Sequence, residues 1–420
     1  MTTFASALED HAAVSSGAKT SLSILGKHLD RVALTNPEID AFAALDPDVS
    51  RRMAREVDPA APLSGVVLAV KDNMDTADFP SRYGSPLYAE HRPPADAAAV
   101  ALARNAGATV IGKTVTTEFA ASRVGRTGNP HRPDHTPGGS SSGSAAAVAS
   151  GMAHVAFGTQ TVGSVIRPAA FCGVVGFKPS FAMIPRVGMK IVADSVDTVG
   201  IFARSIADAA LLFEAVGEIA TPAAPPLASL TIGVCRTPFW DQADAATQSH
   251  LGATADRLKA AGAKIVDLPM PQDWAMIYDW HKTICEYEGA RNMAHEMRVG
   301  RDFIGPDVIV QWDNGAKISP DAYAEAMNKG RRLRQEWDAI AQSVDIVLTP
   351  SARGEAPAGR GNTGDPIFNG LWTFLRLPCV TLPTGKGPTG LPIGSQFIGK
   401  RRHDGALLAA CSALESSLIG

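Results

Sequence analysis

Short apolar runs that alternate with helical segments constrain the fold of this chain more than any other feature of its sequence. Residues 65–70 read Gly-Val-Val-Leu-Ala-Val, a similar run occupies residues 108–112, and core-like sequence returns at residues 344–350. Runs of this length without polar alternation are typical of strands buried on both faces. Residues 95–107 carry apolar side chains at helical spacing between two of these runs. The alternation predicts an α/β protein with a mixed, largely buried β-sheet.

The remaining segments predict further helices and one linker. Leucine and valine at helical spacing over residues 20–45 predict a helix that Asn36-Pro37 interrupts. Further helices are expected over residues 145–152 and, from a cap at Ser205, through Val216. Residues 221–227 are typical of a linker, and residues 240–345 of a more variable helical region.

Charge and cysteine usage exclude several classes of protein. The formal net charge of −3 argues against a dedicated nucleic-acid surface. The five scattered cysteines contain no C-x-x-C pair and indicate reduced thiols in a cytoplasmic protein. The first ten residues lack the features of a signal peptide, and no run approaches the ~18 apolar residues of a membrane span. We therefore expect a soluble protein that binds neither nucleic acid nor membranes.

Two Gly/Ser-rich segments carry the chemistry. They are residues 138–144, Gly-Gly-Ser-Ser-Ser-Gly-Ser, and residues 158–168, Gly-Thr-Gln-Thr-Val-Gly-Ser-Val-Ile-Arg-Pro. The first is not a P-loop, because no lysine follows Gly143. It matches the G-x-S-x-G nucleophile elbow, but that elbow needs a strand directly before it, and residues 133–137 contain two prolines. Glycines allow close approach of backbone to substrate, and hydroxyls can supply a nucleophile.

A serine nucleophile needs a base, and the residues alone offer several candidates. His131 and His135 lie in an irregular loop without further metal ligands at a recognisable spacing, which favours a loop-bracing role. Lys71 ends the buried run 66–70, where burial would lower its pKa and make the neutral amine accessible near neutral pH. A lysine after such a strand is more often a surface residue, so its role stays open at this level. Cys172 lies in an apolar run that favours packing.

Five segments resemble the amidase signature family, and they occur in the family's order. These segments are residues 65–73, 112–120, 138–144, 163–168 and 390–396. The separations between Lys71, Ser140 and Ser164 are also in keeping with the family. Residues 160–170 and the chain length are most similar to malonamidase-like amidases.

The resemblance implies the amidase signature fold, an α/β fold in which helices cover both faces of a large mixed β-sheet core. It implies a single amidase domain over residues 1–420, with the catalytic core at about 60–220 and 340–405. The more variable helical region then covers about 228–343.

The resemblance also implies a catalytic triad. Ser164 attacks the amide carbonyl, and Ser140, held by a cis peptide bond after Gly139, relays the proton. Neutral Lys71 is the final base and returns the proton to the leaving amine. The reaction passes through an acyl-enzyme, needs no cofactor and no metal, and consumes a small-molecule amide. A homodimer is expected.

The oxyanion hole implied by the resemblance contains one departure from the family. Its donors are the backbone N–H groups of Thr161, Val162, Gly163 and Ser164. The family usually has Gly-Gly before the nucleophile, whereas this chain has Val162-Gly163. A β-branched residue does not tolerate a positive φ. Either φ is already negative at this position, or the oxyanion hole is altered.

Arg167 and Gly139 are the predicted substrate-binding residues. The guanidinium of Arg167 carries a permanent charge that binds carboxylates bidentately. If it faces the substrate, the amide carries a carboxylate one or two carbons away, as malonamate does. The alternative is a structural Arg167 paired with Asp72 or Glu118.

The sequence is compatible with three functions. The first is a free-standing amidohydrolase. The second is the amide-handling subunit of a tRNA-dependent amidotransferase, which works with an ammonia-channelling partner and a tRNA-binding partner. The third is an inactive scaffold protein disabled at Val162. The sequence does not identify the amide substrate.

Overall fold

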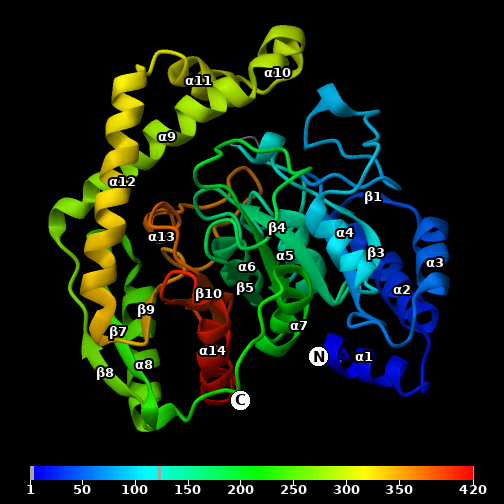
Figure 1. The fold of residues 1–420 in the computed structure, drawn as a ribbon, viewed down its shortest axis with the longest axis horizontal. Coiled ribbons are helices and arrows are strands. Elements are labelled where there is room, and N and C mark those ends of the chain that lie inside the picture. Colours follow the sequence, from blue (N-terminus) through cyan, green and yellow to red (C-terminus); the bar gives the residue numbers. More distant parts are fainter. Residues whose placement is uncertain (1–3, 122–123, 420) are drawn as a thin grey trace.

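A computed structural model of the protein describes residues 4–121 and 124–419, and within them one 11-stranded β-sheet forms the centre of the molecule (Figure 1). The strands are β1 (Phe42–Leu45), β2 (Val67–Lys71), β3 (Thr109–Thr114), β4 (Val155–Gln160), β5 (Val175–Lys178), β6 (Thr198–Ala203), β7 (Thr231–Val234), β8 (Lys264–Asp267), β9 (Ile346–Pro350), β10 (Cys379–Lys386) and β11 (Pro392–Ile398). Their order across the sheet is β1-β3-β2-β4-β6-β5-β10-β11-β9-β7-β8. The pair β2–β4 is parallel and the pair β4–β6 is antiparallel, so the predicted mixed sheet is confirmed.

Helices cover both faces of this sheet. They are α1 (Ala7–Ser15), α2 (Ser21–Ile39), α3 (Pro47–Glu56), α4 (Ala98–Asn105), α5 (Ser142–Ala149), α6 (Ile166–Cys172), α7 (Ile206–Gly217), α8 (Ala245–Ala260), α9 (Ile277–Asn292), α10 (Ala294–Val299), α11 (Pro306–Gly315), α12 (Pro320–Ile340), α13 (Gly370–Phe374) and α14 (Asp404–Leu418). Helices α5 and α6 pack on one face, and α7 and α14 pack on the other. The expected α/β architecture, a large mixed sheet with helices on both faces, is confirmed.

Alternation along β2 determines which side of the sheet receives Lys71. Val67 and Ala69 pack in the cluster that contains α2 and α5, whereas Leu68 and Val70 pack with α4 and α7. Successive side chains of a strand point to opposite faces, so Lys71 points to the α5 side. All five residues of β2 are buried, which is why the sequence shows an apolar run without alternation.

Helix α2 corrects one prediction. Helix α2 continues through Pro37 to Ile39, although an interruption at Asn36-Pro37 was expected. Pro37 lies in the last turn, where the missing N–H removes a single hydrogen bond from the end of the helix. The helix ends at Ile39 and is capped by Asp40, whose φ of 53° is left-handed and whose N–H donates to the carbonyl of Asn36.

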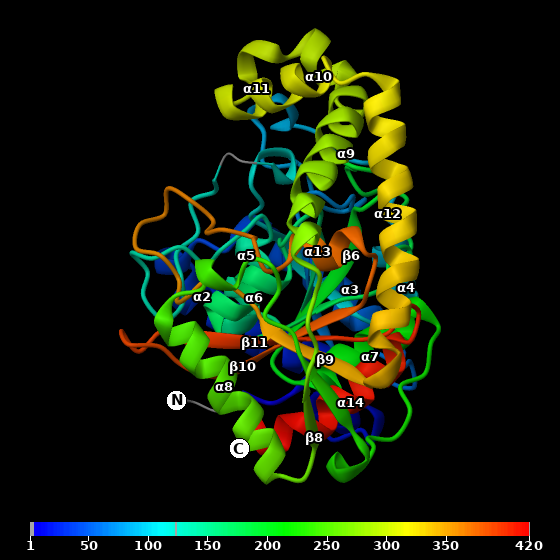
Figure 2. The same ribbon diagram turned by 90° about the vertical axis from the view of Figure 1, so that its left-hand side faces the viewer.

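The region expected to be helical also contains part of the sheet. Helices α9 and α12 lie side by side, with α10 and α11 at their upper end (Figures 1 and 2). The segment 240–345, expected to be a more variable helical region, contains helices α8–α12, and it also contains strand β8 at the edge of the sheet. Strand β8 is short and partly exposed, so it carries no long apolar run that would predict it.

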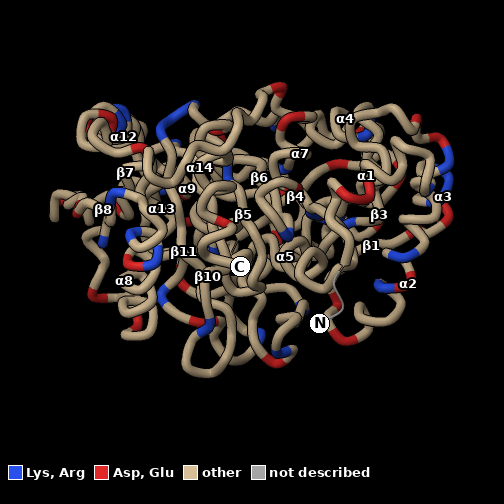
Figure 3. Tube along the Cα trace, turned by 90° about the horizontal axis from the view of Figure 1, so that it is seen from below, with Lys and Arg blue, Asp and Glu red and all other residues tan. Residues whose placement is uncertain are grey.

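Charge and hydropathy on the folded chain agree with its composition. Lys and Arg positions are interspersed with Asp and Glu positions in the view from below (Figure 3). Among the described residues, no helix is both long enough and apolar enough to cross a bilayer.

Candidate active site

Lys71 is buried completely at the end of β2, and its amine contacts two hydroxyl groups. Its Nζ lies 2.7 Å from Oγ of Ser140 and 2.7 Å from Oγ1 of Thr159. Burial lowers the pKa of Lys71 to about 7, although the nearby carboxylate of Asp197 acts in the opposite direction. A neutral amine is therefore available at neutral pH, within hydrogen-bond distance of a hydroxyl from which it can accept a proton.

The loop that carries Ser140 is attached to β4 and packs closely against Thr363. The peptide bond between Gly139 and Ser140 is cis. Ser141 exchanges hydrogen bonds with the backbone N–H and carbonyl of Thr159, which attaches the loop to β4. A Cβ atom at position 139 would lie 2.5 Å from Cγ2 of Thr363, so this close approach requires glycine.

Ser164 lies in the turn between β4 and α6, two residues before the helix begins, and 9% of its surface is exposed. The guanidinium of Arg167 donates to the carbonyl of Gly139 at 2.7 Å and so connects α6 to the loop that carries Ser140. A Cβ atom at position 138 would lie 2.8 Å from Cα of Pro168, so the two Gly/Ser segments are in direct contact.

The backbone carbonyl groups of Val162 and Gly163, the two residues before Ser164, both accept hydrogen bonds within the protein. The carbonyl of Val162 accepts from Oγ1 of Thr373 at 3.0 Å, and the carbonyl of Gly163 accepts from the N–H of Arg167 at 3.1 Å. In a trans peptide the C=O and the following N–H point in opposite directions. The N–H groups of Gly163 and Ser164 therefore each point away from the partner that holds the preceding carbonyl, which leaves them available as donors.

Val162 fits its position without strain. Among the described residues with positive φ, neither Val162 nor Gly163 appears, so the β-branched side chain meets no backbone conflict. Its Cγ1 packs over Gly370, where an added Cβ atom would lie 2.9 Å away. Of the two expectations, the negative φ is the one observed.

A family comparison agrees with this geometry. The model of the Amidase family matches residues 23–408. The chain belongs to the amidase family.

The similar curated sequences are A subunits of an amidotransferase, whereas the similar solved structures include a peptide amidase. The A subunit of glutamyl-tRNA(Gln) amidotransferase from Synechococcus sp. (strain WH7803) is 31% identical over 96% of this chain and 95% of its own length. Its counterpart from Carboxydothermus hydrogenoformans is 32% identical over 92% of both. Among solved structures, peptide amidase PAM with the inhibitor chymostatin is 29% identical, with a TM-score of 0.85 over 98% of this chain and 97% of that one. The malonamidase-like subtype stays a prediction.

Arg167 is buried with two of its guanidinium nitrogen atoms unpaired among the described residues. It is 4% exposed, and its Nη2 also donates to Oγ1 of Thr363 at 3.1 Å, but Nε and Nη1 have no hydrogen-bond partner among the described residues. The alternative of a pair with Asp72 or Glu118 is wrong, because the bonds of Arg167 go to Gly139 and Thr363. Burial lowers the pKa of Arg167 to about 10, so it keeps its charge at neutral pH.

Histidine and cysteine residues near this amidase site have structural roles, as expected. His131 contacts the carbonyl of Cys172 at 2.9 Å, and His135 lies 2.9 Å from the carboxylate of Asp134. All five cysteines are buried and free. Burial raises the pKa of the Cys172 thiol, which makes it a poor nucleophile.

Several residues that shape the site carry no sequence signal by which they could be predicted. Asp197 accepts a hydrogen bond from Oγ1 of Thr161 at 2.6 Å, and Oε1 of Gln160 accepts from the N–H groups of Val165 and Ile166. No sequence pattern marks Asp197 or Thr373. Gln160 lies within the second Gly/Ser segment, but its side chain gives no indication of the two N–H groups that it holds.

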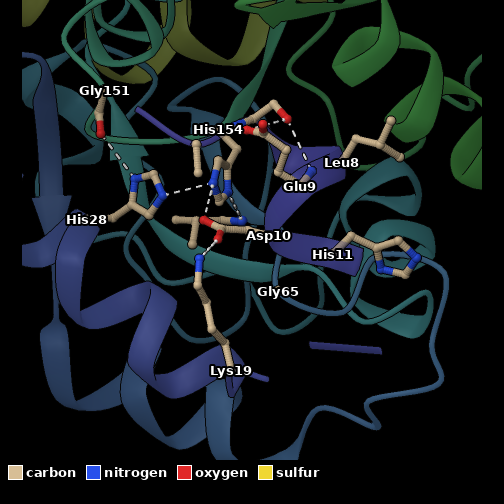
Figure 4. Close-up of polar contacts among 12 residues, drawn as sticks. Leu8, Glu9, Asp10, His11, Lys19, His28, Gly65, Gly151 and His154 are labelled. Carbon is tan, nitrogen blue, oxygen red and sulfur yellow. Dashed lines mark hydrogen bonds and ion pairs between the residues drawn. The ribbon is translucent and has the colours of Figure 1, made fainter. Parts of the chain in front are cut away.

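Among the described residues, the side chains of Asp10, His28 and His154 lie close enough together to hold a metal ion (Figure 4). Nε2 of His154 lies 3.1 Å from Nε2 of His28 and 3.2 Å from Oδ2 of Asp10. The Val67 N–H donates to Nδ1 of His154, so a neutral His154 carries its proton on Nε2. A metal would have to displace that proton, and the ammonium of Lys19 already lies 2.6 Å from Asp10. The arrangement is therefore a hydrogen-bonded network that ties α1 and α2 to β2.

Proposed function

We propose that the protein hydrolyses a small amide with Ser164 as nucleophile, Ser140 as proton relay and Lys71 as base. The observation that carries the proposal is the contact of 2.7 Å between a fully buried lysine amine and Oγ of Ser140. A buried amine with a pKa near 7 is suited to proton transfer at neutral pH, whereas an ordinary lysine is not.

The proposed reaction proceeds in two stages. Oγ of Ser164 attacks the amide carbonyl, and its proton passes through Ser140 to Lys71. The oxyanion is stabilised by the backbone N–H groups of residues 161–164. Lys71 returns the proton through Ser140 to the leaving nitrogen, the C–N bond breaks, and ammonia or an amine departs. Water activated by the same relay then releases the carboxylate from Ser164.

The substrate class is proposed from Arg167. A buried guanidinium with two nitrogen atoms that meet no partner in the described part of the chain is costly unless an acceptor reaches it. A carboxylate on the substrate would accept a charge-assisted hydrogen bond from one of these nitrogen atoms. We therefore propose an amide that carries a carboxylate near its carbonyl, such as malonamate.

The curated relatives favour a second candidate. Their name describes the A subunit of an amidotransferase that acts on glutamyl-tRNA(Gln), and the similarity covers nearly the whole chain. In that case the chain would release ammonia inside a complex with protein partners.

Ammonia release by the purified chain tests the proposal. Malonamate, glutamine and propionamide are supplied at equal concentrations, with Ser164→Ala as the control, and gel filtration reports the oligomeric state. Turnover of malonamate by the chain alone supports the free-standing hydrolase. Turnover of glutamine that depends on added amidotransferase partners supports the second candidate. Ammonia release from none of the three would contradict the proposed acid-amide substrate.

A further inference from the structure

Helix α13 holds the oxyanion turn from behind, although more than 200 residues separate the two segments. Oγ1 of Thr373 donates to the carbonyl of Val162 at 3.0 Å and accepts from Nε2 of Gln160 at 2.9 Å. Thr373 is 1% exposed, so its hydroxyl is shielded from bulk solvent. The hydroxyl also lies 3.4 Å from the carbonyl of Asn369 in its own helix, but the carbonyl of Val162 is nearer and is the better acceptor for the single hydroxyl proton.

The first residues of α13 are also shaped to the turn. A Cβ atom at position 163 would lie 2.6 Å from Oδ1 of Asn369, and one at position 370 would lie 2.9 Å from Cγ1 of Val162. Gly163 is therefore required where Asn369 packs, whereas Val162 is accommodated because residue 370 is glycine. The helix and the turn fit each other at both positions.

We infer that Thr373 is a positioning residue of the oxyanion hole. By holding the carbonyl of Val162, its hydroxyl keeps the Gly163 N–H pointed away from α13, toward the proposed oxyanion. Thr373 does not touch the substrate and acts only through the Val162–Gly163 peptide. This inference rests on the proposed function, because the donor matters only if Ser164 forms a tetrahedral adduct.

Labelling of Ser164 by a fluorophosphonate probe tests the inference. The probe develops negative charge on oxygen as it reacts, so its maximal inactivation rate depends on the oxyanion hole. Thr373→Val, which removes only the hydroxyl, is expected to lower that rate by about 10- to 50-fold, less than the roughly 10²–10³ lost with a direct donor. The probe concentration at half-maximal rate should change by less than about 2-fold. Thr373→Ser, which keeps the hydroxyl, should restore most of the rate.

Thr247→Val is the matched control, because Thr247 is also a buried threonine on a helix but its hydroxyl has no partner within the described ranges. It should label at the wild-type rate. Equal rates for Thr373→Val and wild type would overturn the inference and leave the proposed function intact. Slow labelling of both the Val and the Ser variants, with lowered melting temperatures, would mean a structural role only and would also overturn it. Absence of labelling in the wild type would contradict the proposed function, and the inference with it.

Discussion

Replacing Lys71 by Met is expected to abolish activity and to stabilise the protein at neutral pH. Burial lowers the pKa of Lys71 to about 7, whereas an unfolded chain holds a lysine at about 10.4. Between these values the unfolded chain carries a proton that the folded protein lacks. Protonation therefore favours the unfolded state, most strongly at pH 7 and below, and the penalty disappears as the pH rises through about 10.

The size of this free-energy penalty follows from the lowering of the Lys71 pKa on folding, at about 1.4 kcal/mol for each pKa unit. The penalty is about 4 kcal/mol at pH 7.5 and about 1 kcal/mol at pH 9.5. Met removes the penalty but also the hydrogen bonds to Ser140 and Thr159, which contribute about 1 kcal/mol each. Lys71→Met should then exceed the wild type by about 2 kcal/mol at pH 7.5, and this advantage should vanish or reverse by pH 9.5.

Urea unfolding followed by tryptophan fluorescence at both pH values measures the difference. Lys27→Met, a change at a lysine on the outer side of α2, reports the effect of losing a surface charge alone. A stability difference between Lys71→Met and wild type that stays constant from pH 7.5 to 9.5 would refute the reasoning, because Lys71 would then not be held neutral in the folded protein.

Four further predictions concern catalysis. Activity should rise with pH through about 7, because the base must be neutral; a flat profile from pH 6 to 9 with chemistry rate-limiting would contradict this. Asp197→Asn should move the midpoint of that profile to lower pH, since the carboxylate that opposes the lowered pKa of Lys71 is gone; an unchanged midpoint would exclude this role. Arg167→Gln should lower kcat/KM for acidic amides only, by roughly 10- to 150-fold, which corresponds to about 1.5–3 kcal/mol of lost transition-state stabilisation. An equal loss on propionamide would mean a structural Arg167. EDTA should leave activity intact, and loss that zinc restores would require another mechanism.

The parts of the fold that follow from sequence are those encoded by local pattern. The apolar run before Lys71 predicts a strand buried on both faces, and β2 is buried along its whole length. Helix α7 begins where Ser205 caps it, with the Asp208 N–H donating to the Ser205 hydroxyl. Such features depend on neighbours in sequence, so a single chain is enough to reveal them.

The parts that escaped prediction depend on contacts between distant segments. Thr373 meets Val162 across 211 positions of sequence, and the hydrogen-bonded pair His28 and His154 is separated by 126. Neither pair has a periodicity or spacing that marks it. Strand β8 escaped for a different reason, because an exposed edge strand lacks the apolar run by which β2 is recognised.

Peptide-level mass spectrometry of the fluorophosphonate-treated protein tests the central claim most directly. The account predicts one adduct, on Ser164, formed at a rate that rises with pH through about 7. It predicts no adduct at this site in Ser164→Ala and a loss of several orders of magnitude in labelling rate for Ser140→Ala and Lys71→Met, because the three residues act as one unit. An adduct on another residue, or a labelling rate that Lys71→Met leaves unchanged, would contradict the account.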